Sequence, residues 1–253
     1  MYFEIIKRKM NFRKNNLLLI PLFFFIACKK ENMLDLFKRT GKIVKETRIV
    51  SHVRNFSAGK GKINCFFTRD TVFKVEVEAG KNLIDLIKTE VIGDTLFITN
   101  HNRCNFSRSY KPQINIYIST PDLRKIIQRG AGTIKSTNTI KGDSLFLETW
   151  SSGDVYVDLD CDYLKTHVHN STAVYATGSA RSHDAYMWHN STFFGDNLNT
   201  DYTSVYDNTT GNFYCNANIR ISATMRLNGD IIYSGNPAIS VDYSGGTGKI
   251  IPK

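Results

Sequence analysis

Short segments in which apolar and polar residues alternate run through most of this chain. In the first half they fall at residues 62–68, 72–78, 95–99 and 113–119, where Val, Ile and Phe are abundant. A period of two places every second side chain on the same side of the backbone, which predicts β-strands with one buried side. Residues 81–92 fit either a short helix or a strand with a turn.

From about residue 123 to residue 253 the pattern repeats. Each unit has a small or polar corner residue and, two positions later, an apolar residue that begins a strand. We place the corners at Gly132, Gly153, Thr172, Thr192, Gly211, Gly229 and Gly248, and the apolar positions at Ile134, Val155, Val174, Phe194, Phe213, Ile231 and Ile250. A spacing near 19 residues that recurs over the whole region is typical of a solenoid.

The repeated unit predicts a β-helix in which each strand pairs with its counterpart one coil away. A β-sandwich is the alternative, but it needs hairpin turns that alternate in kind, whereas these corners recur with the same flanking residues. We therefore expect an all-β fold with a parallel β-helix-like solenoid at residues 123–253. An N-terminal β-strand region of the same domain, at residues 49–122, precedes it.

The N-terminus has the order of an export signal. Five Lys or Arg residues between positions 7 and 14 precede an apolar run at residues 17–27, and Lys29, Lys30 and Glu31 follow soon after it. The run is shorter than the roughly 20 apolar residues that span a bilayer. We therefore expect residues 1–27 to be a cleaved signal peptide.

The end of this run, Phe25-Ile26-Ala27-Cys28, resembles the lipobox of bacterial lipoproteins, in which the cysteine receives lipid. Phe25 departs from the pattern, because Leu is commonest at that place. The resemblance implies a membrane anchor on Cys28, with the polar residues 28–48 as a tether. We expect the protein to be attached to the outer membrane and to face the periplasm or the cell surface.

The charge of the mature chain is modest. Removal of residues 1–27 takes away five Lys or Arg residues and Glu4, which leaves 28 basic and 22 acidic residues and a net charge of +6. The mature chain contains no run of five to eight basic residues, so nucleic-acid binding is not favoured. A basic surface beside an anionic membrane explains the excess.

Four cysteines remain besides Cys28, and no two of them have the C-x-x-C spacing of zinc and redox motifs. Export would place the chain where disulfides persist. Cys65 and Cys104, both in the N-terminal half, are the pair that a disulfide could join.

Several corner sequences contain a small residue followed by apolar residues, as in Gly130-Ala-Gly-Thr-Ile, Ser152-Gly-Asp-Val-Tyr and Gly246-Thr-Gly-Lys-Ile. With the lead-in Val44-Lys-Glu-Thr-Arg, they resemble the putative auto-transporter adhesin head family, also called the GIN domain, over roughly residues 45–253. Thr172 and Thr192 depart from the corner glycines of that pattern. The resemblance implies a right-handed β-helix-like domain on an exported or surface protein, without established catalytic residues.

The densest group of carboxylates is Asp154, Asp158, Asp160 and Asp162. The last three share one face of a strand whose Val and Leu residues point inward. Such a group could hold calcium, as in β-helix polysaccharide lyases, and a calcium-assisted polysaccharide enzyme is one alternative function. A lyase also needs a positioned Lys or Arg, which the neighbouring coils do not offer, and solvated Asp residues are the plainer interpretation. The sequence has no G-x-S-x-G, H-E-x-x-H or P-loop motif, so we expect no enzyme and no cofactor.

Strand parity places Tyr156, Tyr175 and Tyr214 on the outside, at equivalent positions of three coils. An outward aromatic stripe suits stacking on sugar rings or a protein partner, and cross-strand stabilisation of an exposed sheet is the alternative. We expect adhesin-like binding of a glycan or a protein through an elongated face of the solenoid, with these tyrosines as candidate ligand-binding residues. A self-assembling envelope scaffold, formed where uncapped coil ends pair, is a third possible function.

Overall fold

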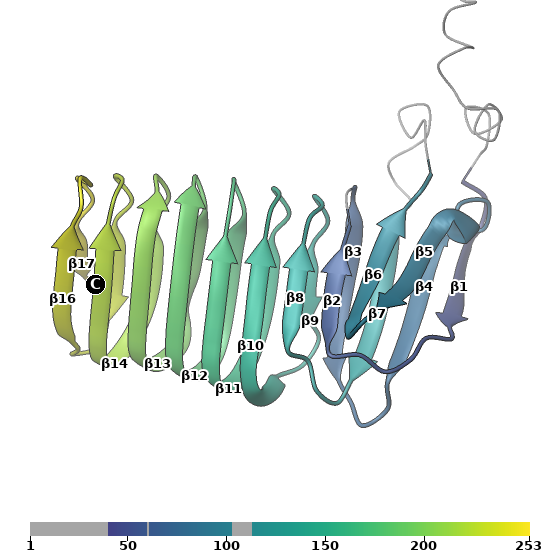
Figure 1. Ribbon diagram of the computed structural model, residues 1–253, viewed down its shortest axis with the longest axis horizontal. Coiled ribbons are helices and arrows are strands. Elements are labelled where there is room, and N and C mark those ends of the chain that lie inside the picture. The colour runs from purple at the N-terminus through teal and green to yellow at the C-terminus, as the bar shows by residue number, and fades with distance from the viewer. Residues whose placement is uncertain (1–39, 60, 103–112) are drawn as a thin grey trace, which may run out of the picture. The chain divides into compact units, whose positions relative to one another are not determined.

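Strand pairing organises the chain into stacked coils (Figure 1). The computed structural model describes residues 40–59, 61–102 and 113–253. Within these ranges one 3₁₀ turn, η3 (Ile84–Leu86), accompanies the strands, and no helix is long and apolar enough to cross a membrane. The expected all-β solenoid is confirmed, with about seven turns of about 19 residues.

The strands are β1 (Ile43–Arg48), β2 (Asn55–Ala58), β3 (Ile63–Arg69), β4 (Lys74–Gly80), β5 (Ile87–Ile92), β6 (Thr95–Asn100), β7 (Ile114–Thr120), β8 (Lys125–Gln128), β9 (Ile134–Ser136), β10 (Ile140–Thr149), β11 (Val155–Val168), β12 (Ala173–His189), β13 (Thr192–Thr209), β14 (Phe213–Met225), β15 (Ile231–Ser234), β16 (Ala238–Tyr243) and β17 (Ile250–Pro252).

Each coil contributes one strand segment to each of two faces. The first face runs through β1, β4, β7, β3, β9, the N-terminal parts of β11 to β14, β15 and β17. The second face runs through β5, β6, β2, β8, the C-terminal parts of β10 to β14, and β16. The long strands change face at a bend, where Asp143, Asp162, Arg181 and Asp201 interrupt the pairing at equivalent places. Charged residues suit this bend because it lies at the solvated edge of the coil.

At the N-terminal end the coils do not follow one another in chain order. β2 pairs in parallel with both β6 and β8, and β3 pairs in parallel with both β7 and β9. The coil made of β2 and β3 therefore lies between two coils that come later in the chain. Beyond them, β4 pairs antiparallel with β7, and β5 pairs antiparallel with β6.

Residues 43–48, which we expected to be part of the tether, form β1 instead. β1 pairs antiparallel with β4, and Val44 packs against the core. In the Ile-Val-Lys-Glu-Thr-Arg segment, exposed and half-buried residues alternate, as in a β-strand. Its pairing with β4 provides hydrogen-bond partners for backbone groups at the edge of β4 that would otherwise be unpaired. The polar composition of residues 28–48 as a whole concealed this short alternation.

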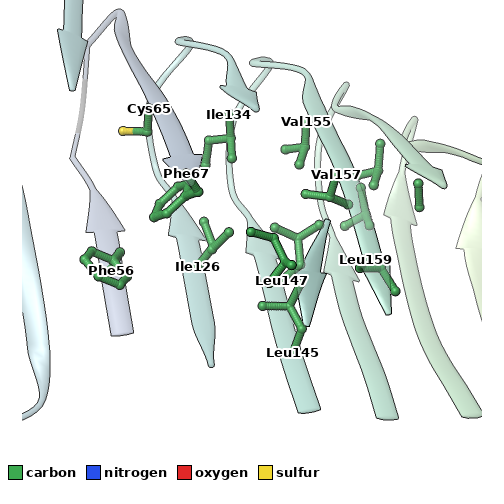
Figure 2. Close-up of a cluster of buried hydrophobic side chains, with 14 of the residues drawn as sticks. Phe56, Cys65, Phe67, Ile126, Ile134, Leu145, Leu147, Val155, Val157 and Leu159 are labelled. Atoms are coloured by element: carbon green, nitrogen blue, oxygen red, sulfur yellow. The ribbon is translucent and has the colours of Figure 1, made fainter. Parts of the chain in front are cut away.

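The core lies between the two faces, and its side chains form rows along the solenoid (Figure 2). On the first face the inward row consists of Cys65, Ile134, Val155, Val174, Phe193, Phe213, Ile231 and Ile250. Facing it, Phe56 and Ile126 begin the inward row of the second face, and the rings of Phe56 and Phe67 meet edge to face at 5.3 Å. Burial of each large apolar side chain contributes about 1.5 to 3 kcal/mol.

One coil is displaced by one residue from the expected register. Phe193, not Phe194, pairs with Val174 and Phe213, and it is fully buried. The corner of this coil is accordingly Ser191 and not Thr192. Two consecutive phenylalanines made both registers apolar in the sequence, and a slip by one residue exchanges the inner and outer sides of a strand.

The corner residues are small because successive corners touch. A Cβ on Gly132 would lie 1.8 Å from the carbonyl oxygen of Ile63, and one on Gly153 would lie 2.1 Å from that of Gly132. Thr172 and Ser191 occupy equivalent corners of their coils, where their side chains form hydrogen bonds. The Thr172 hydroxyl donates to the carbonyl of Ser151, and Ser191 Oγ accepts from the Trp188 amide at 3.2 Å.

Candidate functional site

Four aromatic rings form a stack on the outer surface of the first face. Tyr156, Tyr175, Phe194 and Tyr214 occupy equivalent positions on β11 to β14. Successive ring centroids are 4.7, 4.7 and 5.2 Å apart, and the ring planes differ by 11° or less. Neighbouring strands are about 4.8 Å apart, so rings at one position of adjacent coils stack in parallel. The structure therefore brings the three predicted tyrosines together and adds Phe194.

The inner rings of this stack cover one another. Tyr175 and Phe194 each have an aromatic neighbour on both sides, which leaves ring edges for contact with solvent. Tyr156, at one end, is 38% exposed. Such packing stabilises an exposed sheet, whereas a sugar ring stacks on an uncovered aromatic plane. Ligand binding by Tyr156, Tyr175 and Tyr214 stays a prediction.

Asp158 and Asp162, two of the three candidate metal ligands, lie on different parts of β11: Asp158 on the first face and Asp162 at the bend. Asp158 accepts hydrogen bonds from the hydroxyl groups of Thr139, at 2.5 Å, and Thr177, at 3.0 Å. Asp162 lies at the bend itself, where its carboxylate is 3.9 Å from the guanidinium of Arg181. Asp158 thus connects two neighbouring coils, and Asp162 faces an exposed cation.

Asp160, the third candidate, also connects coils. Its carboxylate accepts a hydrogen bond from Ser179 at 3.0 Å and lies 3.2 Å from the ammonium group of Lys141. The expectation that the neighbouring coils offer no Lys or Arg beside these aspartates was therefore wrong, because Lys141 pairs with Asp160 one coil away. The hydrogen bond from Ser179 and the charge of Lys141 lower the pKa of Asp160. Within the part of the chain that the structure describes, no three His, Cys, Asp or Glu residues are grouped as metal ligands.

The outer surface of the second face carries three parallel rows of side chains. The corner row is Trp150, His169, Trp188 and Asn208, the middle row is Ile127, Glu148, His167, Tyr186, Tyr206, Thr224 and Asp242, and the bend row is Lys125, Phe146, Lys165, Asp184, Ser204, Ser222 and Ser240. Each row takes one residue from each coil that it crosses. A property shared along a row therefore extends along the solenoid.

The corner row presents one exposed indole ring, that of Trp150, and one half-buried indole ring, that of Trp188. His169 lies between Trp150 and Trp188, with ring centroids 4.0 and 5.9 Å away and planes within 7° of parallel. Burial lowers the pKa of His169, which keeps the imidazole neutral near pH 7. Trp150 is 44% exposed, and His169 is its single ring neighbour among the described residues. One side of this indole is therefore open to a ligand.

Cations lie over the aromatic rings of the other two rows. The Lys165 ammonium group is 5.3 Å from the centre of the Tyr186 ring and 5.8 Å from that of Phe146. The Arg226 guanidinium is 5.5 Å from the centre of the Tyr206 ring. Cation–π contacts of this kind stabilise an exposed site by about 0.5 to 1 kcal/mol each.

The second face is hollowed where the bulky side chains of these rows give way to small ones. A groove of about 390 Å³ follows β12 to β16, and its outward lining consists of Tyr186, Ser204, Tyr206, Ser222, Thr224, Ser240 and Asp242. The rings of Tyr186 and Tyr206 are 6.2 Å apart and tilted by 32°. They are packed less closely than the stack on the first face.

The hydroxyl groups in the groove have no protein partners. Ser204, Ser222, Ser240 and Thr224 form no side-chain hydrogen bond within residues 40–59, 61–102 and 113–253. On the first face, in contrast, the Ser and Thr hydroxyl groups beside the aspartates are engaged by them. The groove therefore offers donors and acceptors that are available to an external molecule.

Our sequence analysis missed this groove. Ser204, Ser222 and Ser240 are 18 residues apart in the sequence, which matches the coil length. That spacing could have indicated that the three serines form one row. A single serine in a sequence does not indicate a binding site, however, until strand pairing shows which residues of separate coils are neighbours.

Two predicted cysteine sites lie outside the described residues. These are Cys28, the expected lipid site, and Cys104, the expected disulfide partner of Cys65. Cys65 itself has a free thiol and points into the core, where burial raises its pKa to about 12.

The comparison with protein families gives a match over most of the chain. A family model described as "Putative auto-transporter adhesin, head GIN domain" matches residues 58–237. No curated protein matches the chain.

Solved structures share this fold. A crystal structure of a putative adhesin from Bacteroides fragilis has a TM-score of 0.77 and 24% identity, and the match covers 84% of this chain and 97% of that one. A putative lipid binding protein from Parabacteroides distasonis has a TM-score of 0.65 and 17% identity, with 83% and 97% covered. A putative adhesin from Parabacteroides merdae has a TM-score of 0.62 and 14% identity, with 84% and 98% covered.

Proposed function

This chain belongs to the family described as putative auto-transporter adhesin, head GIN domain, and from that membership we propose that it is an adhesin-like binding protein of the cell envelope. Its role is to hold an external glycan or protein and not to transform it. The engagement of Asp158 and Asp160 by hydroxyl groups and Lys141 supports a non-enzymatic role, because these carboxylates already serve the contacts between coils.

The binding surface in this proposal is the outer surface of the second face. The observation that carries it is the contrast between the two faces. On the first face the aromatic rings cover one another, whereas the second face combines the exposed indole of Trp150 with hydroxyl groups that have no protein partner. Exposed aromatic residues together with available hydrogen-bonding groups are characteristic of recognition surfaces.

A binding assay with matched variants tests this assignment. Purified full-length protein in detergent is applied to arrays of glycans and of extracellular proteins. We expect Trp150→Ala combined with Trp188→Ala to weaken binding at least tenfold, because both indoles of the corner row are lost. Tyr156→Ala combined with Tyr214→Ala removes two rings from the first face and should change binding less than twofold. The reverse result would move the ligand to the tyrosine stack and contradict the proposal.

Attachment to the outer membrane through lipid on Cys28 is part of the same proposal. The sequence Phe25-Ile26-Ala27-Cys28 supports it, and the described fold begins after residue 40. Cells grown with labelled palmitate should incorporate the label into the wild-type protein. Cys28→Ala should abolish labelling and release the protein from the membrane fraction. Equal labelling of the two proteins would refute the anchor.

A further inference from the structure

We infer that the groove on the second face, between Tyr186 and Asp242, is a binding site for neutral carbohydrate. The ligand is a short run of pyranose units that lies along the solenoid axis, across β12 to β16. This inference rests on the proposed function and narrows it from a glycan or protein ligand to one chemical class and one place.

The bend row provides the floor of the site. Ser204, Ser222 and Ser240 occupy equivalent positions on adjacent coils, so their hydroxyl groups recur at the strand spacing of about 4.8 Å. This repeat is comparable to the length of one pyranose unit in an extended chain. Each serine hydroxyl can both donate and accept a hydrogen bond, as each sugar hydroxyl can. These hydroxyl groups have no partner among the described residues, so no hydrogen bond of the described fold is lost when a sugar binds.

The middle row provides an aromatic wall. Tyr186 and Tyr206 both line the groove, and their rings are tilted by 32° with centroids 6.2 Å apart. The first-face rings, in contrast, differ by at most 11° and are separated by 4.7 to 5.2 Å. His167 and Lys165 also contact the Tyr186 ring, and Trp188 and Arg226 contact the Tyr206 ring. The ring surface available to the C–H groups of a pyranose, which stack on aromatic planes, is therefore the part that lines the groove.

The charge of the lining selects a neutral sugar. Asp242 lies in the groove, its carboxylate accepts a hydrogen bond from Ser244 at 2.9 Å, and it forms no ion pair with a described residue. No Lys or Arg lines the groove. Beside Asp242, the carboxylate of a uronic or sialic acid would therefore meet a like charge, which is unfavourable. The cations beside the groove, Lys165 and Arg226, lie over the rings of Tyr186 and Tyr206 and not beside Asp242. The hydroxyl groups of a neutral sugar, in contrast, can donate to Asp242.

The size of the groove agrees with this ligand class. Its volume of about 390 Å³ lies within the range of about 300 to 1,000 Å³ that is typical of small-ligand sites. The small Ser and Thr side chains leave this space open, whereas the Tyr rings close one end. A single bulky substitution in the floor would therefore fill the site without a change in the core.

Isothermal titration calorimetry tests the inference with cellohexaose, mannohexaose and maltohexaose as neutral probes and oligogalacturonate as the acidic probe. We expect at least one neutral probe to bind the purified full chain and oligogalacturonate not to bind. Ser222→Tyr, which fills the floor, and Tyr206→Ala, which removes part of the wall, should each raise the Kd at least tenfold. Lys135→Tyr adds a ring to an exposed position of the first face and should leave the Kd within twofold.

Three outcomes would overturn the inference: no neutral probe binds, Ser222→Tyr leaves the Kd unchanged in a protein with a wild-type melting temperature, or oligogalacturonate binds as tightly as the neutral probes. The inference can also fail while the proposed function holds. If Trp150→Ala with Trp188→Ala abolishes binding to an array ligand while Ser222→Tyr does not affect it, the second face remains the ligand surface and the groove is excluded.

Discussion

At the scale of single residues, His183 and Asp207 both lie inside the solenoid, and neither forms an ion pair with another described residue. His183 is buried against Phe193, its Nε2 is 2.9 Å from the Thr166 hydroxyl, and burial lowers its pKa to about 3. Asp207 accepts a hydrogen bond from the Thr209 amide at 3.1 Å, and burial raises its pKa to about 7. Both side chains are therefore neutral in the folded state at mildly acidic pH.

Asp207 makes stability depend on pH in a defined direction. Its folded pKa of about 7 lies above the ordinary value of 3.8, so the folded state holds the proton more tightly than the unfolded state. The contribution of protonated Asp207 to the free energy of unfolding is fully present below about pH 4 and is lost as the pH rises towards 7. Asp207→Asn removes this pH-dependent contribution. The free energy of unfolding of the variant, relative to the wild type, should therefore increase between pH 4 and pH 8 by on the order of 4 kcal/mol.

Urea unfolding at a series of pH values measures this difference. Asp162→Asn, which changes an exposed carboxylate at a bend, serves as the control for the loss of one negative charge. A difference for Asp207→Asn that does not change with pH would mean that Asp207 is ionised in the folded protein.

At the scale of single elements, the sequence pattern predicted most strands, and the errors have specific physical causes. Alternation identified β3, β4, β6 and β7, and the corner spacing identified the coils. The register of β13 was misassigned because Phe193 and Phe194 are both apolar, and only packing decides which one turns inward. β1 was missed because its alternation is short and its paired residues in β4 lie 27 (75 − 48) to 37 (80 − 43) positions away in the sequence.

The register of β13 has a measurable consequence. Phe193 is fully buried and stacks on Phe213 at 5.0 Å, so Phe193→Ala should lower the free energy of unfolding by about 3 to 5 kcal/mol. Phe194 is half-buried in the outer stack, and Phe194→Ala should cost about 1 to 2 kcal/mol. Chemical denaturation of both variants gives the comparison. A larger loss for Phe194→Ala would show that the coil has the other register.

The candidate site was less predictable than the strands. Strand parity was sufficient to place Tyr156, Tyr175 and Tyr214 outside, since it depends on local alternation alone. The groove depends on which residues of separate coils adjoin. Ser204 and Ser222 become neighbours only through the pairing of β13 with β14, whose register shifts twice before it reaches them. The exact coil length, which sets this register, cannot be obtained from local pattern.

At the scale of the whole described domain, the position of the coil formed by β2 and β3 is the feature that the sequence concealed. Local alternation indicates that these segments are strands but not which strands they join. β2 and β3 each have a parallel partner on both sides, although they lie near the start of the fold. β16 and β17, at the other end, each pair on one side among the described residues.

Hydrogen exchange should reflect this difference. In a stacked-coil protein each coil is stabilised by its neighbours, so a terminal coil opens more easily than an inner one. We expect the amides of β2 and β3 to be among the most protected and those of β16 and β17 to exchange at least tenfold faster. Mass spectrometry of peptides from the wild-type protein measures both. Comparable rates in the two regions would contradict the inserted position of β2 and β3.

The inserted coil also determines how the domain would respond to mechanical load. A pull from the N-terminal side can detach β1 from β4, but it then meets β2 and β3, where two ladders must rupture together. A pull from the C-terminal side meets β17 and β16, where one ladder at a time can be peeled away. The two ends of the described domain thus differ in mechanical strength, and the N-terminal end is the one that resists unravelling. In the anchored adhesin that we propose, the force of shear flow on a bound ligand would be transmitted through that end.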